Sequence, residues 1–124
     1  MITGSCLCGQ VTYETEASPT SASMCHCAQC SKQSGGVWAS AQVHEDALTI
    51  NGTVTWFQAS VHAKRGFCPI CGSFLFWHGA GEDQISFSLG SVTKPTGLQL
   101  EKHIFVNEKS DYYEIADGLP QHPK

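Results

Sequence analysis

The seven cysteines are the residues with the clearest capacity for chemistry, because they are grouped and not scattered. They form a CxC pair at 6 and 8, a CxCxxC triplet at 25, 27 and 30, and a CxxC pair at 68 and 71. Cysteine sulfurs at such spacings converge on one metal ion, and zinc binds thiolates in tetrahedral geometry at about 2.3 Å. Isolated buried cysteines would not place every member of the set in a motif. The pattern therefore predicts metal binding, with zinc as the metal.

The number of sulfurs in each group predicts two zinc ions with different roles. The two pairs together supply four ligands, which is a closed structural site: Cys6, Cys8, Cys68 and Cys71. The triplet supplies three ligands and leaves one position for water or substrate, as reactive zinc sites do. We therefore expect a catalytic zinc at Cys25, Cys27 and Cys30. In the alternative, both ions serve folding alone, and a histidine or another side chain completes the second site.

The rest of the composition limits the partners of the protein. The net charge is −4 and the one arginine is Arg65, which argues against nucleic acid because binding to phosphates needs clustered Lys and Arg. The first residues lack the basic flank and apolar run of a secretory signal, and no stretch approaches the ~20 apolar residues of a membrane span. We therefore expect a cytoplasmic protein with reduced thiols and no membrane contact.

The elements that must position the cysteines are mostly strands. Residues 85–89 alternate polar and apolar, and β-branched or aromatic residues recur between glycines at 11–13, 54–57 and 73–77. Asn51-Gly52, between 47–50 and 53–56, predicts a two-residue β-hairpin. A single helical turn is expected at 28–33, ended by Gly35-Gly36. The chain therefore predicts one all-β domain over residues 1–124, with packed antiparallel sheets and at most short helical turns.

Several residues near the cysteines have a functional and an ordinary interpretation. His26 lies between two candidate ligands, so its side chain is expected to point away from the metal. The other histidines are interpreted as core or surface residues, His44 and His122 as exposed ones; the rest are His62, His78 and His103. The cations that could meet a substrate carboxylate are Lys32, Lys64 and Arg65, with ordinary surface charge the favoured interpretation. Two interpretations are open for Trp38, Trp56 and Trp77: they line an apolar wall of the substrate pocket, or they pack in the core. The backbone N–H groups of 31–36 are candidate donors to a bound anion.

The motifs together resemble the glutathione-dependent formaldehyde-activating enzyme family. The resemblance rests on Gly4-Ser5-Cys6-Leu7-Cys8-Gly9, on the triplet segment 25–30, and on Phe67-Cys68-Pro69-Ile70-Cys71-Gly72-Ser73. It continues in His103-Ile104-Phe105-Val106 and in 113–120. It spans nearly the whole chain and identifies the family without identifying one substrate.

The resemblance implies a β-tent fold and the same division into a structural and a catalytic zinc. It also implies a carbon–sulfur lyase that joins a thiol, glutathione in the named activity, to an aldehyde, formaldehyde. The chain looks shorter than the founding enzyme, and its few cations suit a dicarboxylate such as glutathione poorly. A different class stays open: a zinc-stabilised binding or chaperone-like module without turnover. A vacant fourth position at the triplet favours the enzyme, and a fourth protein ligand there favours the module.

Overall fold

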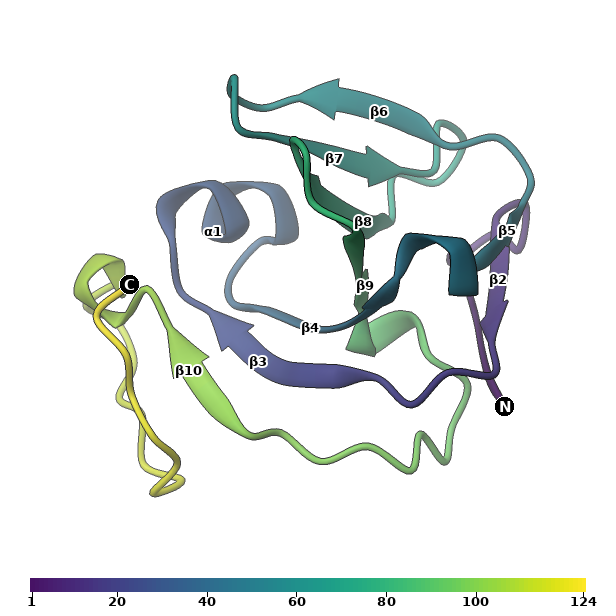
Figure 1. Cartoon of the computed structure of the whole chain (residues 1–124). Coiled ribbons are helices and arrows are strands. Elements are labelled where there is room, and N and C mark those ends of the chain that lie inside the picture. Colours follow the sequence, from purple (N-terminus) through teal and green to yellow (C-terminus); the bar gives the residue numbers. More distant parts are fainter.

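The computed structural model describes residues 1–124 as ten short strands, one α-helix and three 3₁₀ turns (Figure 1). The strands are β1 (Ile2–Ser5), β2 (Thr12–Thr15), β3 (Thr20–Cys25), β4 (Trp38–His44), β5 (Thr49–Asn51), β6 (Thr55–Gln58), β7 (Ala63–Phe67), β8 (Phe74–Gly79), β9 (Gln84–Ser88) and β10 (Lys102–Ile104). The helix is α1 (Ala28–Ser34), and the 3₁₀ turns are η1 (Glu45–Ala47), η2 (Leu89–Ser91) and η3 (Val106–Glu108). No helix is long and apolar enough to cross a bilayer.

The strands form two sheets, as the β-tent prediction requires. One sheet has the order β1-β2-β5, and the other has the order β10-β3-β4-β9-β8-β7-β6. All neighbouring strands are antiparallel except β10, which pairs with β3 in parallel. The prediction of packed sheets with little helix is therefore confirmed, with one parallel pair added. Figure 1 shows the larger sheet curving from β10 and β3 to β7 and β6, with α1 at its open side.

The core lies between the two sheets and is organised around one tyrosine. The Tyr13 ring of β2 packs on Phe76 of β8 and Phe87 of β9, with ring centroids 5.4 and 5.6 Å away. Gly4 lies opposite Tyr13 on β1, and a Cβ there would come within 2.2 Å of the tyrosine ring. Glycine at this position therefore lets the ring lie flat across β1 and reach the other sheet.

The predicted hairpin at Asn51-Gly52 is wrong, although the turn exists. Gly52 has the positive φ of +94° expected of a turn, but β5 pairs with β2 and β6 pairs with β7. The side chain of Gln10 takes the hydrogen bonds that a hairpin partner would make, because it bonds both the N–H and the C=O of Thr53. The turn therefore carries the chain from the small sheet to the edge of the large one.

The two faces of the larger sheet have different environments. On β4, Ala41 and Val43 point into the core, whereas Trp38 and Ser40 alternate with them and line a cavity on the opposite face. Residue 87 of β9 is likewise a core residue, and its neighbour Ser86 lines the cavity. The curvature of the sheet encloses this second face, so its side chains are partly removed from solvent.

Candidate metal centres

The first group of cysteines brings two loops together in the core. The Sγ atoms of Cys6 and Cys8, from the loop after β1, meet those of Cys68 and Cys71, from the loop after β7, all within 4.8 Å of one another. Cys6 and Cys8 Sγ are 3.7 Å apart, and Cys8 and Cys68 Sγ are 3.8 Å apart. Four sulfurs at zinc-bond length in a tetrahedron are about 3.8 Å apart. The donor set therefore fits a tetrahedral metal ion.

Both loops have the same local form. In the first, Gly9 has φ +82° and its N–H bonds the Cys6 carbonyl; in the second, Gly72 has φ +78° and its N–H bonds the Cys68 carbonyl. Such tight turns place the two sulfurs of each pair on the same side of the loop. Glycine is therefore needed at positions 9 and 72, because each turn requires a positive φ there.

Hydrogen bonds to the sulfurs prepare this group for a cation. The Val11 N–H is 3.3 Å from Cys6 Sγ, and Gln10 Nε2 is 3.3 Å from Cys68 Sγ. The Ser73 hydroxyl beside Cys71 lowers the pKa of that thiol to about 5. Because metals bind the thiolate, donors that stabilise negative charge on sulfur favour metal binding.

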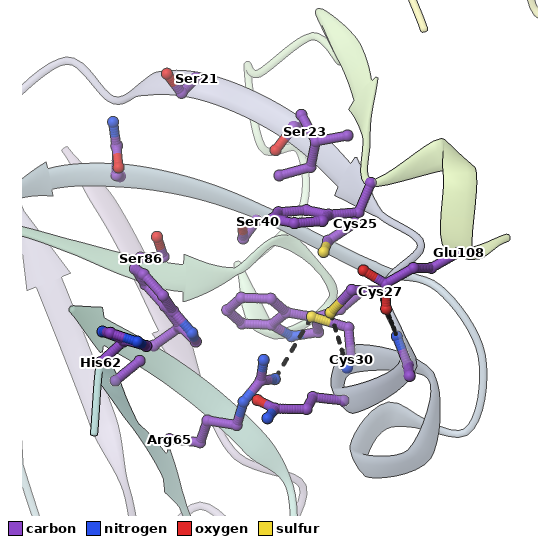
Figure 2. Close-up of a pocket in the computed structure, with 18 of the residues that line it drawn as sticks. Ser21, Ser23, Cys25, Cys27, Cys30, Ser40, His62, Arg65, Ser86 and Glu108 are labelled. Carbon is purple, nitrogen blue, oxygen red and sulfur yellow. Dashed lines mark hydrogen bonds between the residues drawn. The ribbon is translucent and has the colours of Figure 1, made fainter. Parts of the chain in front are cut away.

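The second group lies at the end of β3 and the start of α1, and it faces the cavity (Figure 2). The Sγ atoms of Cys25, Cys27 and Cys30 lie within 4.8 Å of one another. Cys25 and Cys30 are buried and Cys27 is partly exposed. No His, Cys, Asp or Glu ligand atom joins the three sulfurs in this group. The arrangement could hold a metal ion and leaves its fourth ligand to come from the cavity.

Cys27 is also the N-cap of α1. Its Sγ accepts a hydrogen bond from the Cys30 N–H at 3.3 Å, as an N-cap oxygen does in other helices. Contacts with the Cys25 and Cys30 thiols lower the pKa of Cys27 to about 2, and contacts with the Cys27 and Cys30 thiols raise the pKa of Cys25. The lowered pKa favours the thiolate form of Cys27, the residue at the helix N-terminus.

The backbone N–H groups of 31–36 are not available to a bound anion, contrary to the sequence hypothesis. The helix begins at Ala28, so the Ser31 and Gly35 N–H groups bond carbonyls within the helix, and the Gly36 N–H bonds the Ser34 hydroxyl. The N–H at the helix start, that of Ala28, bonds the Glu108 carboxylate at 3.1 Å. The predicted helix also begins at residue 28, so residues 31–36 form its last turn and its C-terminal end, where the backbone N–H groups are already paired.

Arg65 supplies the positive charge of this group, and its interpretation as surface charge is wrong. The residue is 4% exposed, and its guanidinium Nη1 lies 3.5 Å from both Cys30 Sγ and Gln33 Oε1. The guanidinium also lies over the Phe74 ring, 5.5 Å from the centroid. Its position on β7 faces the cavity across from α1 (Figure 2). A buried guanidinium beside three sulfurs balances negative charge on them.

The cavity beside the second group has a volume of about 760 Å³. Its floor is the concave face of β3, β4 and β9, and α1, β7 and the segment after β10 form its walls. Trp38 and Trp77 line it, and Trp38 stacks on Phe74 with centroids 4.3 Å apart. This volume falls in the range of small-molecule sites and greatly exceeds that of a few water molecules.

The remaining candidates lie outside this cavity or at its edge. Trp56 packs against Phe76 in the core, and Lys64 lies over the Trp56 ring. Lys32 is on the far side of Arg65, in a separate shallow depression. His62 is exposed and lines the cavity, and His78 lies 3.0 Å from the Glu45 carboxylate. The exposed positions predicted for His44 and His122 are confirmed.

His26 points away from the sulfurs, as predicted, and begins a buried chain of hydrogen bonds. Its Nε2 is 2.9 Å from His103 Nδ1, and its Nδ1 contacts the Tyr113 hydroxyl. His103 Nε2 is 2.7 Å from the Asp117 carboxylate. The carboxylate only accepts, so each imidazole donates toward Asp117 and the Tyr113 hydroxyl donates to His26. Burial lowers the pKa of His26, which keeps the imidazole neutral.

This chain fastens the C-terminal segment to the residue between two candidate ligands. The contact between His26 and His103 could not be predicted from the sequence, because the two residues are 77 positions apart. The parallel pairing of β10 with β3, which sets His103 opposite Met24, brings the two imidazoles together. The separate motifs 103–106 and 113–120 were the only sequence signal for this contact.

Comparisons with known proteins agree with this geometry. The family model described as glutathione-dependent formaldehyde-activating enzyme matches residues 1–108. A crystal structure of a Rhodobacter sphaeroides protein is similar in fold, with a TM-score of 0.58 and 23% identity, covering 78% of this chain and 90% of that one. No curated protein sequence matches.

Proposed function

Since the chain belongs to the glutathione-dependent formaldehyde-activating enzyme family, we propose that it is a zinc-dependent enzyme that joins a thiol to an aldehyde. In this reaction the thiol sulfur forms a bond to the aldehyde carbon, and the C=O π bond breaks. The proton that the thiol loses ends on the former carbonyl oxygen, so the product is the sum of the two reactants and nothing is oxidised or reduced. The thiol and the aldehyde in the description of the family are glutathione and formaldehyde.

The two groups of cysteines are proposed to hold one zinc ion each. Cys6, Cys8, Cys68 and Cys71 would complete a tetrahedral sphere and stabilise the fold. Cys25, Cys27 and Cys30 would hold the second ion. When bound, that ion supplies a fourth position at which a thiolate sulfur is held and oriented.

The observation that carries the proposal is the composition and placement of the second group. Three sulfurs converge without a fourth protein ligand, and all three belong to residues that line the cavity. A metal that served only the fold would be expected to have four protein ligands, as the first group does. This difference favours the enzyme over the non-catalytic binding module.

Arg65 addresses the electrostatic difficulty of such a site. Zinc with three thiolates carries a net charge of −1, so the approach of a fourth thiolate is opposed. The Arg65 guanidinium, 3.5 Å from Cys30 Sγ and buried, brings the total to zero. It therefore makes the binding of an anionic sulfur less unfavourable, and this effect is strong because the site is shielded from water.

The two reactants would occupy different amounts of the cavity. Formaldehyde is smaller than the space beside the sulfurs, whereas the cavity of about 760 Å³ accommodates a thiol of drug-like size. The Trp38 and Trp77 rings line the cavity and limit access of water to the reacting atoms. The chain's own contribution is thus to orient the sulfur, balance its charge and exclude part of the solvent.

The test is exchange spectroscopy on glutathione and formaldehyde at equilibrium, with and without the zinc-loaded protein. The protein is expected to raise the exchange rate above the spontaneous rate, and Cys27→Ser is expected to remove the increase. An unchanged rate with two zinc ions per chain would exclude glutathione with formaldehyde as the reactants. Repetition with other thiols would then decide between a different substrate and the non-catalytic module.

A further inference from the structure

Two buried side-chain nitrogens beside the triplet have no hydrogen-bond partner. They are Nε1 of Trp38 on β4 and Nε of Arg65 on β7, and both side chains line the cavity. The same description applies to His78 Nε2, but that atom lies 3.0 Å from the Glu45 carboxylate and so has an acceptor within reach. Buried N–H groups are normally paired, because the hydration that they lose on burial has to be replaced. The two nitrogens beside the triplet therefore need an acceptor that the chain does not supply.

Water in the cavity does not supply this acceptor. Trp38 is 6% exposed and Arg65 is 4% exposed, and the two nitrogens themselves are closed to solvent. The acceptor therefore has to be small, and it has to enter from the cavity between the side chains that surround the sulfurs. Its entry requires a small movement of those side chains, which is a measurable consequence of binding.

Both donors are held next to the sulfurs, and both pack on the Phe74 ring. The Trp38 ring stacks on Phe74 with centroids 4.3 Å apart, and the guanidinium carbon of Arg65 lies 5.5 Å from the Phe74 centroid. Trp38 is the partner of Cys25 across β3 and β4. Arg65 Nη1 lies 3.5 Å from Cys30 Sγ, and Figure 2 shows its guanidinium directed toward the sulfurs. The two unpaired donors therefore belong to the immediate surroundings of the place proposed for the thiol.

The chemistry of the two donors defines the acceptor. An indole N–H and a guanidinium N–H only donate hydrogen bonds, and the guanidinium carries a positive charge. The acceptor is therefore an atom that bears or gains negative charge, and oxygen accepts such bonds more strongly than sulfur does. When a thiolate adds to an aldehyde, negative charge leaves the sulfur and appears on the carbonyl oxygen. This oxygen is the small acceptor that the reaction itself brings to the sulfurs.

We propose that Trp38 Nε1–H and Arg65 Nε–H bind the oxygen of the aldehyde and stabilise the negative charge that develops on it. This inference rests on the proposed function and adds a place for the second reactant. As the C–S bond forms, the π electron pair of the C=O bond moves onto the oxygen. The oxygen then takes from water a proton equal to the one that the thiol gave up, so both donors keep their own. Fixed donors of this kind stabilise the transition state more than the reactants.

The direct test follows the indole N–H signal of Trp38 by proton–nitrogen NMR of the zinc-loaded protein, with Trp38→Phe used to assign the signal. Ethanethiol supplies a sulfur without an oxygen, and ethanethiol with formaldehyde supplies both. The Trp38 indole proton is expected to move downfield when formaldehyde joins the thiol, because a hydrogen bond to oxygen deshields it. The Trp56 signal is the internal control, since that ring packs in the core on Phe76. A shift that ethanethiol alone produces in full, or no shift with either sample, would overturn the proposal.

Matched variants measure the effect on the rate of exchange between ethanethiol and formaldehyde. Trp38→Phe removes the N–H and keeps a ring on Phe74, so it is expected to lower the protein-dependent rate about 10–100-fold, as the loss of one bond to a charged oxygen does. Ethanethiol binding, followed by the absorption bands of the cobalt-loaded protein, is expected to stay unchanged in this variant. Arg65→Lys keeps the positive charge and removes Nε, and the same fall in rate is expected. Trp56→Phe is the control and should leave the rate unchanged.

The two measurements separate this inference from the proposed function. If the wild type does not accelerate the addition but the Trp38 indole proton moves when formaldehyde joins the thiol, the proposed function fails and the oxygen site is supported. If the wild type accelerates the addition, and Trp38→Phe and Arg65→Lys accelerate it equally well, the proposed function stands and the oxygen site is overturned.

Discussion

The two groups of cysteines use the same ligand type in opposite settings. In the first, Cys6 and Cys68 belong to the main hydrophobic core between the sheets, and the sulfurs accept bonds from Gln10 and Val11. In the second, the sulfurs face a cavity and their charged partner is the guanidinium of Arg65. The two groups therefore differ in the neighbours of the cysteine motifs and not in the motifs themselves, and the different roles proposed for them rest on those neighbours.

The largest effect is expected from the removal of one ligand from the first group. Cys68→Ser is expected to abolish cooperative unfolding, because the loss of a structural zinc is comparable to the whole stability of a small domain, about 5–15 kcal/mol. Circular dichroism melting of the zinc-loaded variant measures the effect. A melting temperature close to that of the wild type would show that the first group does not hold the fold together.

The matched change in the second group should leave the fold intact. Cys27→Ser is expected to keep a cooperative transition and to lower the zinc content from about two ions per chain to about one, since Cys27 is partly exposed and lies outside the main core. Elemental analysis together with thermal melting checks both statements. Unfolding as severe as that of Cys68→Ser would remove the distinction between the groups.

On the cavity side, Arg65 is expected to balance the negative charge of the sulfurs. Arg65→Met is expected to weaken ethanethiol binding at the second group by about 10–100-fold, because a hydrogen bond to a charged group contributes about 1.5–3 kcal/mol. Cobalt substituted for zinc reports binding through its visible absorption bands. Lys64→Met is the neighbouring control, since Lys64 lies over Trp56 and away from the sulfurs. If both variants bind ethanethiol like the wild type, charge balance by Arg65 is refuted.

The smallest expected effect is the pH dependence of the stability that Tyr13 contributes in the core. Burial raises the pKa of Tyr13 to about 12 from 10.0, so its contribution to stability is complete below pH 10 and is lost as the pH rises toward 12. Tyr13→Phe loses the hydrogen bond to Ser91 and is expected to be about 1 kcal/mol less stable at pH 8. At pH 11 this difference should shrink or reverse. Urea unfolding at the two values measures it, and a constant difference would contradict the assignment.

Features set by neighbouring residues could be predicted from the sequence. The cysteine groups arise from loops of a few residues with glycine at a required position, such as Gly9 and Gly72, and spacing alone therefore predicted which sulfurs pair within each loop. The strands at 12–15 and 84–88 and the end of the helix at Gly35 follow from equally local patterns. Local chemistry thus predicted the elements and the groups of candidate ligands.

Features that depend on distant pairing could not be predicted in the same way. The strand 49–51 pairs with the strand 12–15. The turn at Gly52 does not predict this pairing, because it depends on residues far away in the sequence. Arg65 is buried because the curved sheet brings β7 across from α1, whereas its neighbours in the sequence suggest a surface position. The side chains that surround the sulfurs therefore required the three-dimensional structure.

The hydrogen-bond chain that begins at His26 also determines where the protein can be shortened. The family match ends at residue 108, and all seven cysteines precede that point, so 108 looks like a natural boundary. A chain ended there would lack Tyr113 and Asp117, the outer partners of two buried imidazoles. His26 would then be left underpaired between two ligands of the second group. The last residues of the chain therefore support the residue between two sulfurs of the triplet, although they contribute no sulfur to it.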